Sequence, residues 1–312
     1  MLLRLFLTLV LLSTPFLERT LAEETFPERP LKIVVYTESG GVIDQTARQL
    51  ALVLEKSNVA VPVVVENIKG GGGLVAIEHI LRQPADGYTL FALTSSVISK
   101  AVASKRESRL ELLDYLALVV DDYECLIVHR EGSLKTFEDL KSFVRSKNSN
   151  SNWVGPASGG TDHLFAQKVW ASLGMKANWI PYRSGGEAIA AILGKHGDVY
   201  VGNPQDTLGR PDLQVLAVAS PQRLKGFESA PTFAELGYPE LSGESLWRGF
   251  ALRSETPANV RARWKVLLEK ATSDPTWQQF VLAGAALPRF ETDDEFRSIV
   301  HAQIESDKKL LF

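Results

Sequence analysis

One stretch of the sequence, residues 31–56, constrains the fold most, because an apolar run, a glycine turn and a helical pattern follow one another directly. Residues 31–36 are short, apolar and β-branched, which predicts a buried strand. Gly40 and Gly41 then supply a tight turn, and Asp44 opens a run of apolar residues at helical spacing. Such a helix start presents unpaired backbone N–H groups to an anion, so this stretch predicts the first half of a ligand site.

The first 22 residues have the pattern of a secretory signal peptide. Arg4 precedes an apolar run over residues 5–12, and residues 20–22 place small side chains before a possible cleavage site at Glu23. The apolar run is too short for a membrane anchor, which needs about 20 residues. We therefore expect export with cleavage. Cys125 is the only cysteine, so an exported chain has no internal disulfide and depends on its apolar core.

The composition and motifs exclude several classes of function. The formal net charge is −3 and no basic run is interleaved with aromatic residues, so nucleic acid is not an expected partner. The five histidines show no metal-binding spacing, and we expect no metal. Gly71, Gly73 and Ala76 formally match a dinucleotide fingerprint, but the next strand lacks the acidic residue that the fingerprint requires. We therefore expect no cofactor.

The succession of strand, glycine turn and helix recurs along the first half of the chain. A second β-branched run over residues 59–65 leads into the glycines 70–73 and another helical pattern. A third apolar strand, residues 90–93, ends in hydroxyl side chains that include Ser95. This order predicts a parallel sheet with right-handed crossovers, in which ligands lie beyond the carboxyl ends of the strands.

A second sheet of the same kind is predicted in the second half. Residues 155–162 form a glycine-rich turn before an apolar helix, and Tyr182 ends a strand before another glycine turn. Each half therefore presents glycine turns at helix starts. Asp44, Thr161 and Asp162 are also typical helix-capping residues that need not contact a ligand, and this alternative stays open.

The order and spacing of these motifs resemble a known family, the Bug-type solute receptors of tripartite tricarboxylate transporters. The similarity runs from about residue 26 to the C-terminus. In the first half it rests on Gly40-Gly41-x-x-Asp44-x-x-Ala47-Arg48, Val65-Glu66-Asn67 and Asp86-Gly87-Tyr88-Thr89-Leu90. In the second half it rests on Gly160-Thr161-x-His163-Leu164, Pro181-Tyr182-Arg183, Asp198, Pro231-Thr232-x-x-Glu235-x-Gly237 and Trp247-x-Gly249.

This resemblance implies an α/β fold of the two-lobed periplasmic binding protein type, similar to type II, with each lobe a mostly parallel sheet flanked by helices. Residues 23–125 are expected to form the N-terminal part of the first lobe, and residues 126–225 the second lobe. Residues 226–312 are expected to pack back on the first lobe. The resemblance places the ligand in the cleft between the lobes, which close by a hinge.

The resemblance further implies a monomeric periplasmic receptor, not an enzyme. It would capture a small organic acid, or a carboxylate that also bears an amino or amide group, and deliver it to membrane transporter subunits. A receptor that signals to a membrane sensor without transport needs the same closing cleft. A hydrolase is the other alternative, since Ser158, Asp162 and His163 are suitable residue types, but the adjacent Asp162 and His163 cannot both align with Ser158.

The ligand-binding residues carried over from the family fall on glycine turns, where a two-pronged clamp binds a carboxylate largely through backbone groups. The first prong comprises Ser39, Gly40, Gly41 and Asp44, and the second comprises Gly70, Gly71, Gly72 and Gly73. The second lobe is expected to add Ser158, Gly160, Thr161, Tyr182 and Asp198. Two further candidates from the first lobe are Glu38 and Ser95.

Glu38 and Lys69 depart from the family pattern beside this clamp. The family usually has a small residue at the first position and often a proline at the second. A carboxylate next to an anion clamp opposes a second anionic group, which suggests a ligand with an amino or amide group. Two alternatives are a Glu38–Lys69 ion pair and two side chains exposed to solvent.

Overall fold

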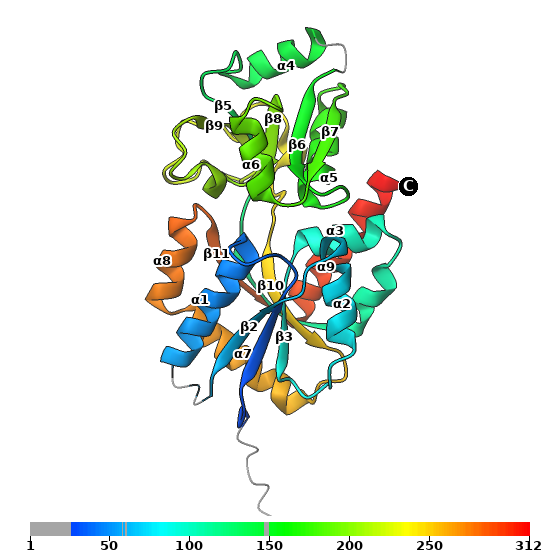
Figure 1. Ribbon diagram of the computed structural model, residues 1–312, viewed down its shortest axis with the longest axis vertical. Coiled ribbons are helices and arrows are strands. Elements are labelled where there is room, and N and C mark those ends of the chain that lie inside the picture. Colours follow the sequence, from blue (N-terminus) through cyan, green and yellow to red (C-terminus); the bar gives the residue numbers. More distant parts are fainter. Residues whose placement is uncertain (1–25, 58, 60, 147–149) are drawn as a thin grey trace, which may run out of the picture.

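The structure, a computed structural model, describes residues 26–57, 59, 61–146 and 150–312. The expected signal peptide lies outside the described residues. Figure 1 shows two lobes, one above the other along the longest axis, each built around its own β-sheet. None of the helices that the structure describes is long and apolar enough to cross a membrane.

The sheet of the first lobe has six strands in the order β11-β4-β10-β3-β1-β2 within the described ranges. The strands are β1 (Leu31–Val35), β2 (Val63–Asn67), β3 (Thr89–Thr94), β4 (Leu113–Asp121), β10 (Arg248–Arg253) and β11 (Leu287–Thr292). β1 pairs in parallel with β2 and β3, whereas β10 is antiparallel to both β3 and β4. The predicted parallel arrangement of the first three strands is therefore confirmed.

Helices cover both faces of this sheet, because its strands are apolar on both sides. One face packs against α1 (Val42–Lys56), α7 (Ala258–Thr272) and α8 (Pro275–Ala283). The other packs against α2 (Leu74–Leu81), α3 (Ser95–Ala103) and α9 (Asp293–Leu311). Two short 3₁₀ helices, η1 (Gly71–Gly73) and η2 (Glu107–Leu112), join strands and helices here.

The second lobe repeats this architecture on a smaller sheet in the order β7-β6-β8-β5-β9. Its strands are β5 (Cys125–His129), β6 (Asn152–Pro156), β7 (Asn178–Tyr182), β8 (Val199–Gly202) and β9 (Leu213–Val218). Its helices are α4 (Phe137–Ser146), α5 (Thr161–Ser172), α6 (Gly185–Leu193), η3 (Pro204–Thr207) and η4 (Pro239–Leu241). In both sheets the strand that enters from the other lobe, β10 or β5, runs antiparallel to its two neighbours.

The chain crosses between the lobes twice, and the two crossings lie side by side. Glu124 N donates to Glu244 O at 3.0 Å, and Leu246 N donates to Asp122 O at 2.8 Å. We call these paired segments, residues 122–124 and 243–247, the hinge. The sequence analysis predicted that the chain returns from the second lobe to the first at residue 226. Phe233, however, packs in the second core, so the chain returns only through the hinge.

Candidate functional site

Three helices that begin at the interlobe ends of their strands have glycine at the N-cap. They are α1, α2 and α5, which start after Gly41, Gly73 and Gly160, and no described side chain caps them. By contrast, Thr94 caps α3 and Ser184 caps α6 through side-chain hydrogen bonds. Because the first N–H groups of a helix have no intrahelical partner, glycine at the N-cap leaves them available to a bound anion.

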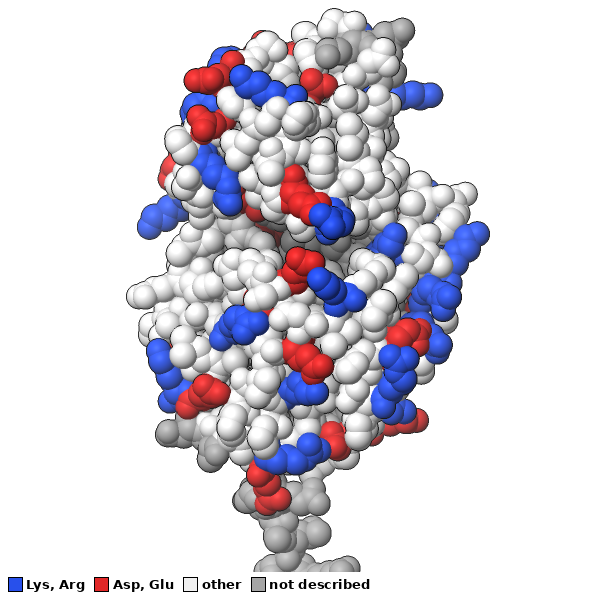
Figure 2. Space-filling model, viewed as in Figure 1, with Lys and Arg blue, Asp and Glu red and all other residues white. Residues whose placement is uncertain are grey.

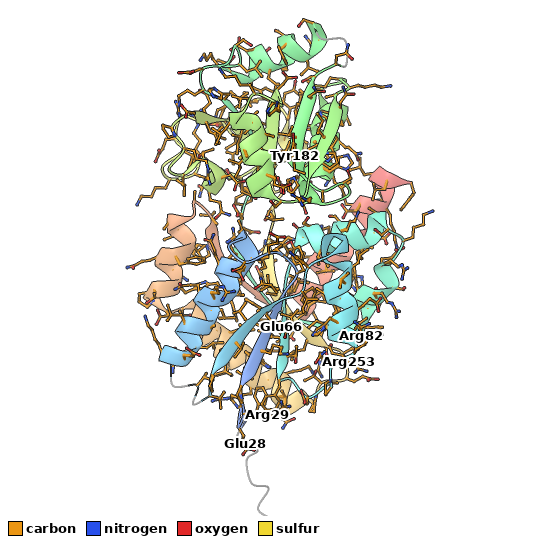
Figure 3. All side chains as sticks on the ribbon, viewed as in Figure 1. Glu28, Arg29, Glu66, Arg82, Tyr182 and Arg253 are labelled. Atoms are coloured by element: carbon orange, nitrogen blue, oxygen red, sulfur yellow. The ribbon has the colours of Figure 1, made fainter. Side chains whose placement is uncertain are left out.

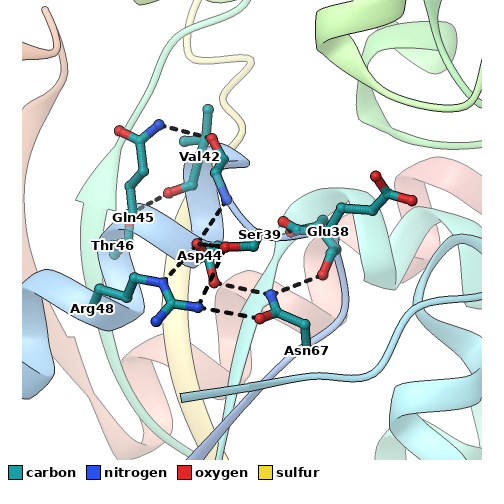
Figure 4. A network of polar contacts seen from close by, with 10 residues as sticks. Glu38, Ser39, Val42, Asp44, Gln45, Thr46, Arg48 and Asn67 are labelled. Atoms are coloured by element: carbon teal, nitrogen blue, oxygen red, sulfur yellow. Dashed lines mark hydrogen bonds and ion pairs between the residues drawn. The ribbon is translucent and has the colours of Figure 1, made fainter. Parts of the chain in front are cut away.

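The buried carboxylate of Asp44 stabilises the turn before α1 through hydrogen bonds (Figure 4). Its carboxylate accepts hydrogen bonds from Gly40 N at 2.8 Å, Arg48 Nε at 2.9 Å and Asn67 Nδ2 at 2.9 Å. Asn67 Nδ2 also donates to the carbonyl of Thr37 at 3.0 Å, so the end of β2 is tied to the same turn. Asp44 thus fixes the turn before α1 and joins it to the end of β2.

The charge of Asp44 is compensated within this network. Burial raises the pKa of Asp44, but hydrogen bonds from Arg48, Gly40 and Asn67 outweigh burial and hold the pKa below its usual range. Ser39 Oγ lies at 3.5 Å from the same carboxylate. The ionised carboxylate accepts hydrogen bonds from protein donors and is buried. The exposed part of the prong is the backbone of Gly40 and Gly41.

The second prong consists of four consecutive glycines with positive φ. The φ values are 132°, 59°, 65° and 102° for Gly70, Gly71, Gly72 and Gly73. Residues other than glycine rarely adopt such positive φ angles. A Cβ on Gly73 would also lie 2.0 Å from Val97 Cγ2. The glycines are therefore required by the backbone path of this turn.

The predicted residues of the second-lobe turn lie against α3 of the first lobe. Thr161 Oγ1 donates to Ser95 Oγ at 2.9 Å, and Ser95 donates to the carbonyl of Ser245 in the hinge at 2.9 Å. Lys100 Nζ donates to the carbonyl of Ser158 at 3.0 Å, and a Cβ on Gly160 would lie 2.5 Å from Ser96 Oγ. The hydroxyls of Ser95 and Thr161 are thus buried and join the lobes in this arrangement.

Tyr182 and Asp198 lie at opposite ends of the second sheet. Tyr182 ends β7, and its carbonyl accepts from Ala157 N at 2.7 Å, which places it beside the glycine-rich turn at the interlobe end (Figure 3). Asp198 instead precedes β8, where its carboxylate accepts from Asn152 N at 2.8 Å at the start of β6. Because ligands meet the carboxyl ends of such strands, the prediction that Asp198 contacts the ligand is corrected.

Two ion pairs lie at the exposed rim of the site, one on each lobe. Lys69 Nζ lies 2.8 Å from Glu38 Oε1 in the first lobe, and Arg183 lies 2.6 Å from Glu187 in the second. The Lys69 hydrogen bond holds the pKa of Glu38 below its usual range, and Arg183 adds to this effect from the other lobe. Figure 2 shows charges of both signs on each side of the recess between the lobes. The structure has the Glu38–Lys69 ion pair, and both side chains are at the same time largely exposed to solvent.

A buried group of acidic side chains around the hinge was missed at the level of sequence. It comprises the buried Asp122, Glu124 and Asp162 together with the partly exposed Asp206, and Arg248 is bound to Asp122. Burial raises the pKa of Asp122 to about 6 and that of Asp162 to about 7, and it raises that of Glu124 well above its usual range. The sequence indicated Asp162 only as a capping or catalytic candidate, and the acidic run around Glu124 is of a kind that ordinarily lies in solvent.

The residues weighed for catalysis do not form a relay. His163 Nδ1 accepts from Gly159 N at 3.1 Å, and its ring packs on Trp179 with centroids 5.0 Å apart. Neither contact links His163 to Ser158 or Asp162. Among the described residues no group of three or more His, Cys, Asp or Glu side chains is arranged to hold a metal ion.

Two lobes joined by a double hinge, with glycine-capped helix starts facing the space between them, define a solute-binding protein. The chain matches the sequence pattern of the tripartite tricarboxylate transporter family receptors over residues 46–311. It therefore belongs to this family, and the resemblance seen in the sequence is confirmed.

Individual relatives agree with this assignment. Protein BugT of Bordetella pertussis is 27% identical over 95% of this chain and 92% of its own length. The solved structure of MatC from Rhodopseudomonas palustris with bound malate has a TM-score of 0.81 at 21% identity, covering 92% of this chain and all of that one. An R. palustris protein with adipate has a TM-score of 0.82 at 20% identity, covering 91% and 97%. At these identities the solved structures confirm the fold.

Proposed function

We propose that this protein is a periplasmic receptor that captures a small carboxylate solute between its lobes and delivers it to the membrane subunits of a tripartite transporter. The observation that carries the proposal is the set of glycine-capped helix starts, with the first prong fixed by the buried Asp44. Family membership supports the transporter as partner, and the proteins with malate and adipate support the class of solute.

In this proposal the first backbone N–H groups of α1 and α2 bind the carboxylate, because they have no partner within their helices and lie at the positive ends of these helices. Gly40 and Gly41 lead into the first of these helix starts, and Gly71 to Gly73 lead into the second. Asp44, Arg48 and Asn67 hold the prongs in place without contacting the solute. The bound solute stabilises the closed form by its higher affinity for that form.

The proposal is tested by thermal unfolding of the mature protein with mono-, di- and tricarboxylates, amino acids and aromatic acids. A solute at a hundredfold excess over its dissociation constant adds about 2.7 kcal/mol to the unfolding free energy. We expect a clear stabilisation by at least one carboxylate. The same solute should fail to stabilise Gly41→Val and Gly72→Val, where added bulk blocks the prongs.

Two results would contradict the proposal. One is an unchanged melting temperature with every carboxylate tested, and the other is normal binding by both glycine variants. Circular dichroism of the unliganded variants provides the control, since a loss of the fold would also remove binding. Gly226→Val, at an open position on the second lobe with φ of 83°, serves as a matched glycine substitution away from the prongs.

A further inference from the structure

Four carboxyl groups come together where the hinge meets the second lobe. Asp122 and Glu124 lie in the hinge, Asp162 in the first turn of α5, and Asp206 in η3. The charges of Asp162, Asp122 and Asp206 each raise the pKa of Glu124. Arg248, which binds Asp122, also donates to Thr46 Oγ1 in α1 at 3.1 Å, so this group of acids adjoins the helix of the first prong as well. We call these four residues the hinge acids.

Two of the hinge acids have partners that compensate their charge. Asp122 binds the guanidinium of Arg248, which is itself buried and also donates to Thr46 Oγ1 at 3.1 Å. Asp206 accepts from Tyr200 Oη at 2.7 Å and from Asn203 N at 3.0 Å. Neither carboxyl oxygen of Glu124 has a hydrogen-bond partner among the described residues, and Asp162 accepts a hydrogen bond from its own backbone N–H.

Glu124 is 0% exposed, and neither oxygen of its carboxyl group has a hydrogen-bond partner among the described residues. Lys168 does not compensate it, because this ammonium group binds both oxygens of Glu244 at 2.7 and 2.8 Å. Asp162 is 4% exposed and has no ion pair in the part of the chain that the structure describes. Two buried carboxyl groups thus share a site that contains no cation of its own for them.

An ionised carboxyl group in such a place is costly unless it gains a proton or a cation. Burial and mutual repulsion favour the protonated form, which agrees with the raised pKa values of both groups. A cation brought by the solute would compensate the same two groups directly. A metal ion is disfavoured, because the described residues offer no arrangement of three metal ligands.

We propose that Glu124 and Asp162 bind the protonated amino group of the solute, so that this receptor selects carboxylates that also carry an amine. This inference rests on the proposed function, in which the glycine prongs bind the carboxylate. Glu124 is enclosed in the present arrangement of the lobes, so the solute reaches it while the lobes are apart. An ammonium group has three N–H donors, enough for both carboxyl groups.

The inference is tested by calorimetric titration of the mature protein with pairs of ligands that differ in the amino group, such as aspartate and succinate or glutamate and glutarate. We expect the amino-bearing member to bind at least about tenfold tighter, because hydrogen bonds between charged groups are the stronger ones. Equal or weaker binding of the amino-bearing member overturns the inference and leaves the proposed function standing. Binding by no carboxylate contradicts both.

Variants locate the preference within the protein. Glu124→Gln should fold, because it keeps the size of the side chain and removes a buried group that can ionise, and it should lose the preference for the amine. Asp162→Asn should weaken the preference as a second, independent variant. Glu187→Gln removes a carboxylate from the exposed rim pair and should keep it. The preference retained in both Glu124→Gln and Asp162→Asn overturns the inference.

Proton exchange gives a readout that does not depend on a variant. If an ammonium group replaces the protons of Glu124 and Asp162, binding releases protons near neutral pH and the affinity rises with pH. Titration in two buffers of different ionisation enthalpy measures this release. Proton uptake on binding overturns the inference, because it means that these carboxyl groups are neutralised by protons in the complex.

Discussion

Asp44 and Glu124 are both buried carboxylic acids beside the proposed site, yet their surroundings are opposite. Asp44 receives hydrogen bonds from a backbone N–H, an arginine and an asparagine, and its pKa is lowered. Glu124 receives none from the described residues, and its pKa is raised. Burial alone therefore does not define the role of an acid. The hydrogen-bond donors around a buried acid determine whether its carboxylate stabilises the fold or remains available to a ligand.

The largest expected effect follows from removing Arg248, the cation that binds Asp122. Arg248→Met leaves Asp122 buried without its partner, which should lower the unfolding free energy by about 3–5 kcal/mol. Chemical denaturation of the unliganded protein measures this change. Asp122→Asn in the same background should recover part of the loss. A loss no larger for Arg248→Met than for Arg183→Met, at the exposed rim, would contradict the account.

Replacing Asp44, which fixes the turn of the first prong, should have a smaller effect on stability. Asp44→Ala leaves Gly40 N and Asn67 without their acceptor, which should cost about 1–3 kcal/mol of unfolding free energy. Ligand affinity should fall as well, because the first prong is no longer fixed. Denaturation and titration of the same variant test both effects. Unchanged affinity would show that the prong does not depend on Asp44.

The two kinds of acid should also produce opposite pH dependences of stability. Asp122 and Asp162 have folded pKa values raised to about 6 and about 7, so their contribution to stability is lost as pH rises towards neutrality. Asp44 has a lowered pKa, so its contribution is lost as pH falls below about 4.

Denaturation between pH 3 and pH 8 measures this pH profile. Asp162→Asn should flatten the decline towards neutral pH and leave the acid limb intact. A flat profile of the wild-type protein above pH 5 would contradict the raised pKa values.

The smallest effect is expected at the rim. Glu38→Gln removes an exposed ion pair with Lys69, and such pairs contribute little because water and salt screen them. We expect no measurable change in melting temperature and no change in the ranking of ligands. A shift in preference towards dicarboxylates would return amine recognition to Glu38 and away from Glu124.

The sequence predicted the local structure of the first-lobe turns well, because its signals are local. Strand, glycine turn and helix start follow one another within residues 31–56, and the elements β1 and α1 lie where this pattern indicated. The positive φ values of Gly70 to Gly73 likewise follow from residue type. Two lobes were also predicted, although Phe233 moves the return crossing well beyond residue 226.

The hinge acids could not be predicted, because their environment is created by distant segments. Asp122 and Arg248 are separated by 126 positions in the sequence. The burial of Glu124 depends on the pairing of the two crossings, for which the sequence has no local signal. Asp198 was misplaced for the same reason, since only the register of β6 and β8 shows which end of the sheet it occupies.

The most direct test of the central claim is an NMR titration of the mature protein with the carboxylate that stabilises it most. The account predicts that the backbone amide resonances of Gly40, Gly41 and Gly71 to Gly73 shift strongly as the ligand saturates the protein. The amide of Gly226, on the second lobe, serves as the unaffected reference. A ligand that binds tightly while these five glycine resonances stay in place would contradict the clamp.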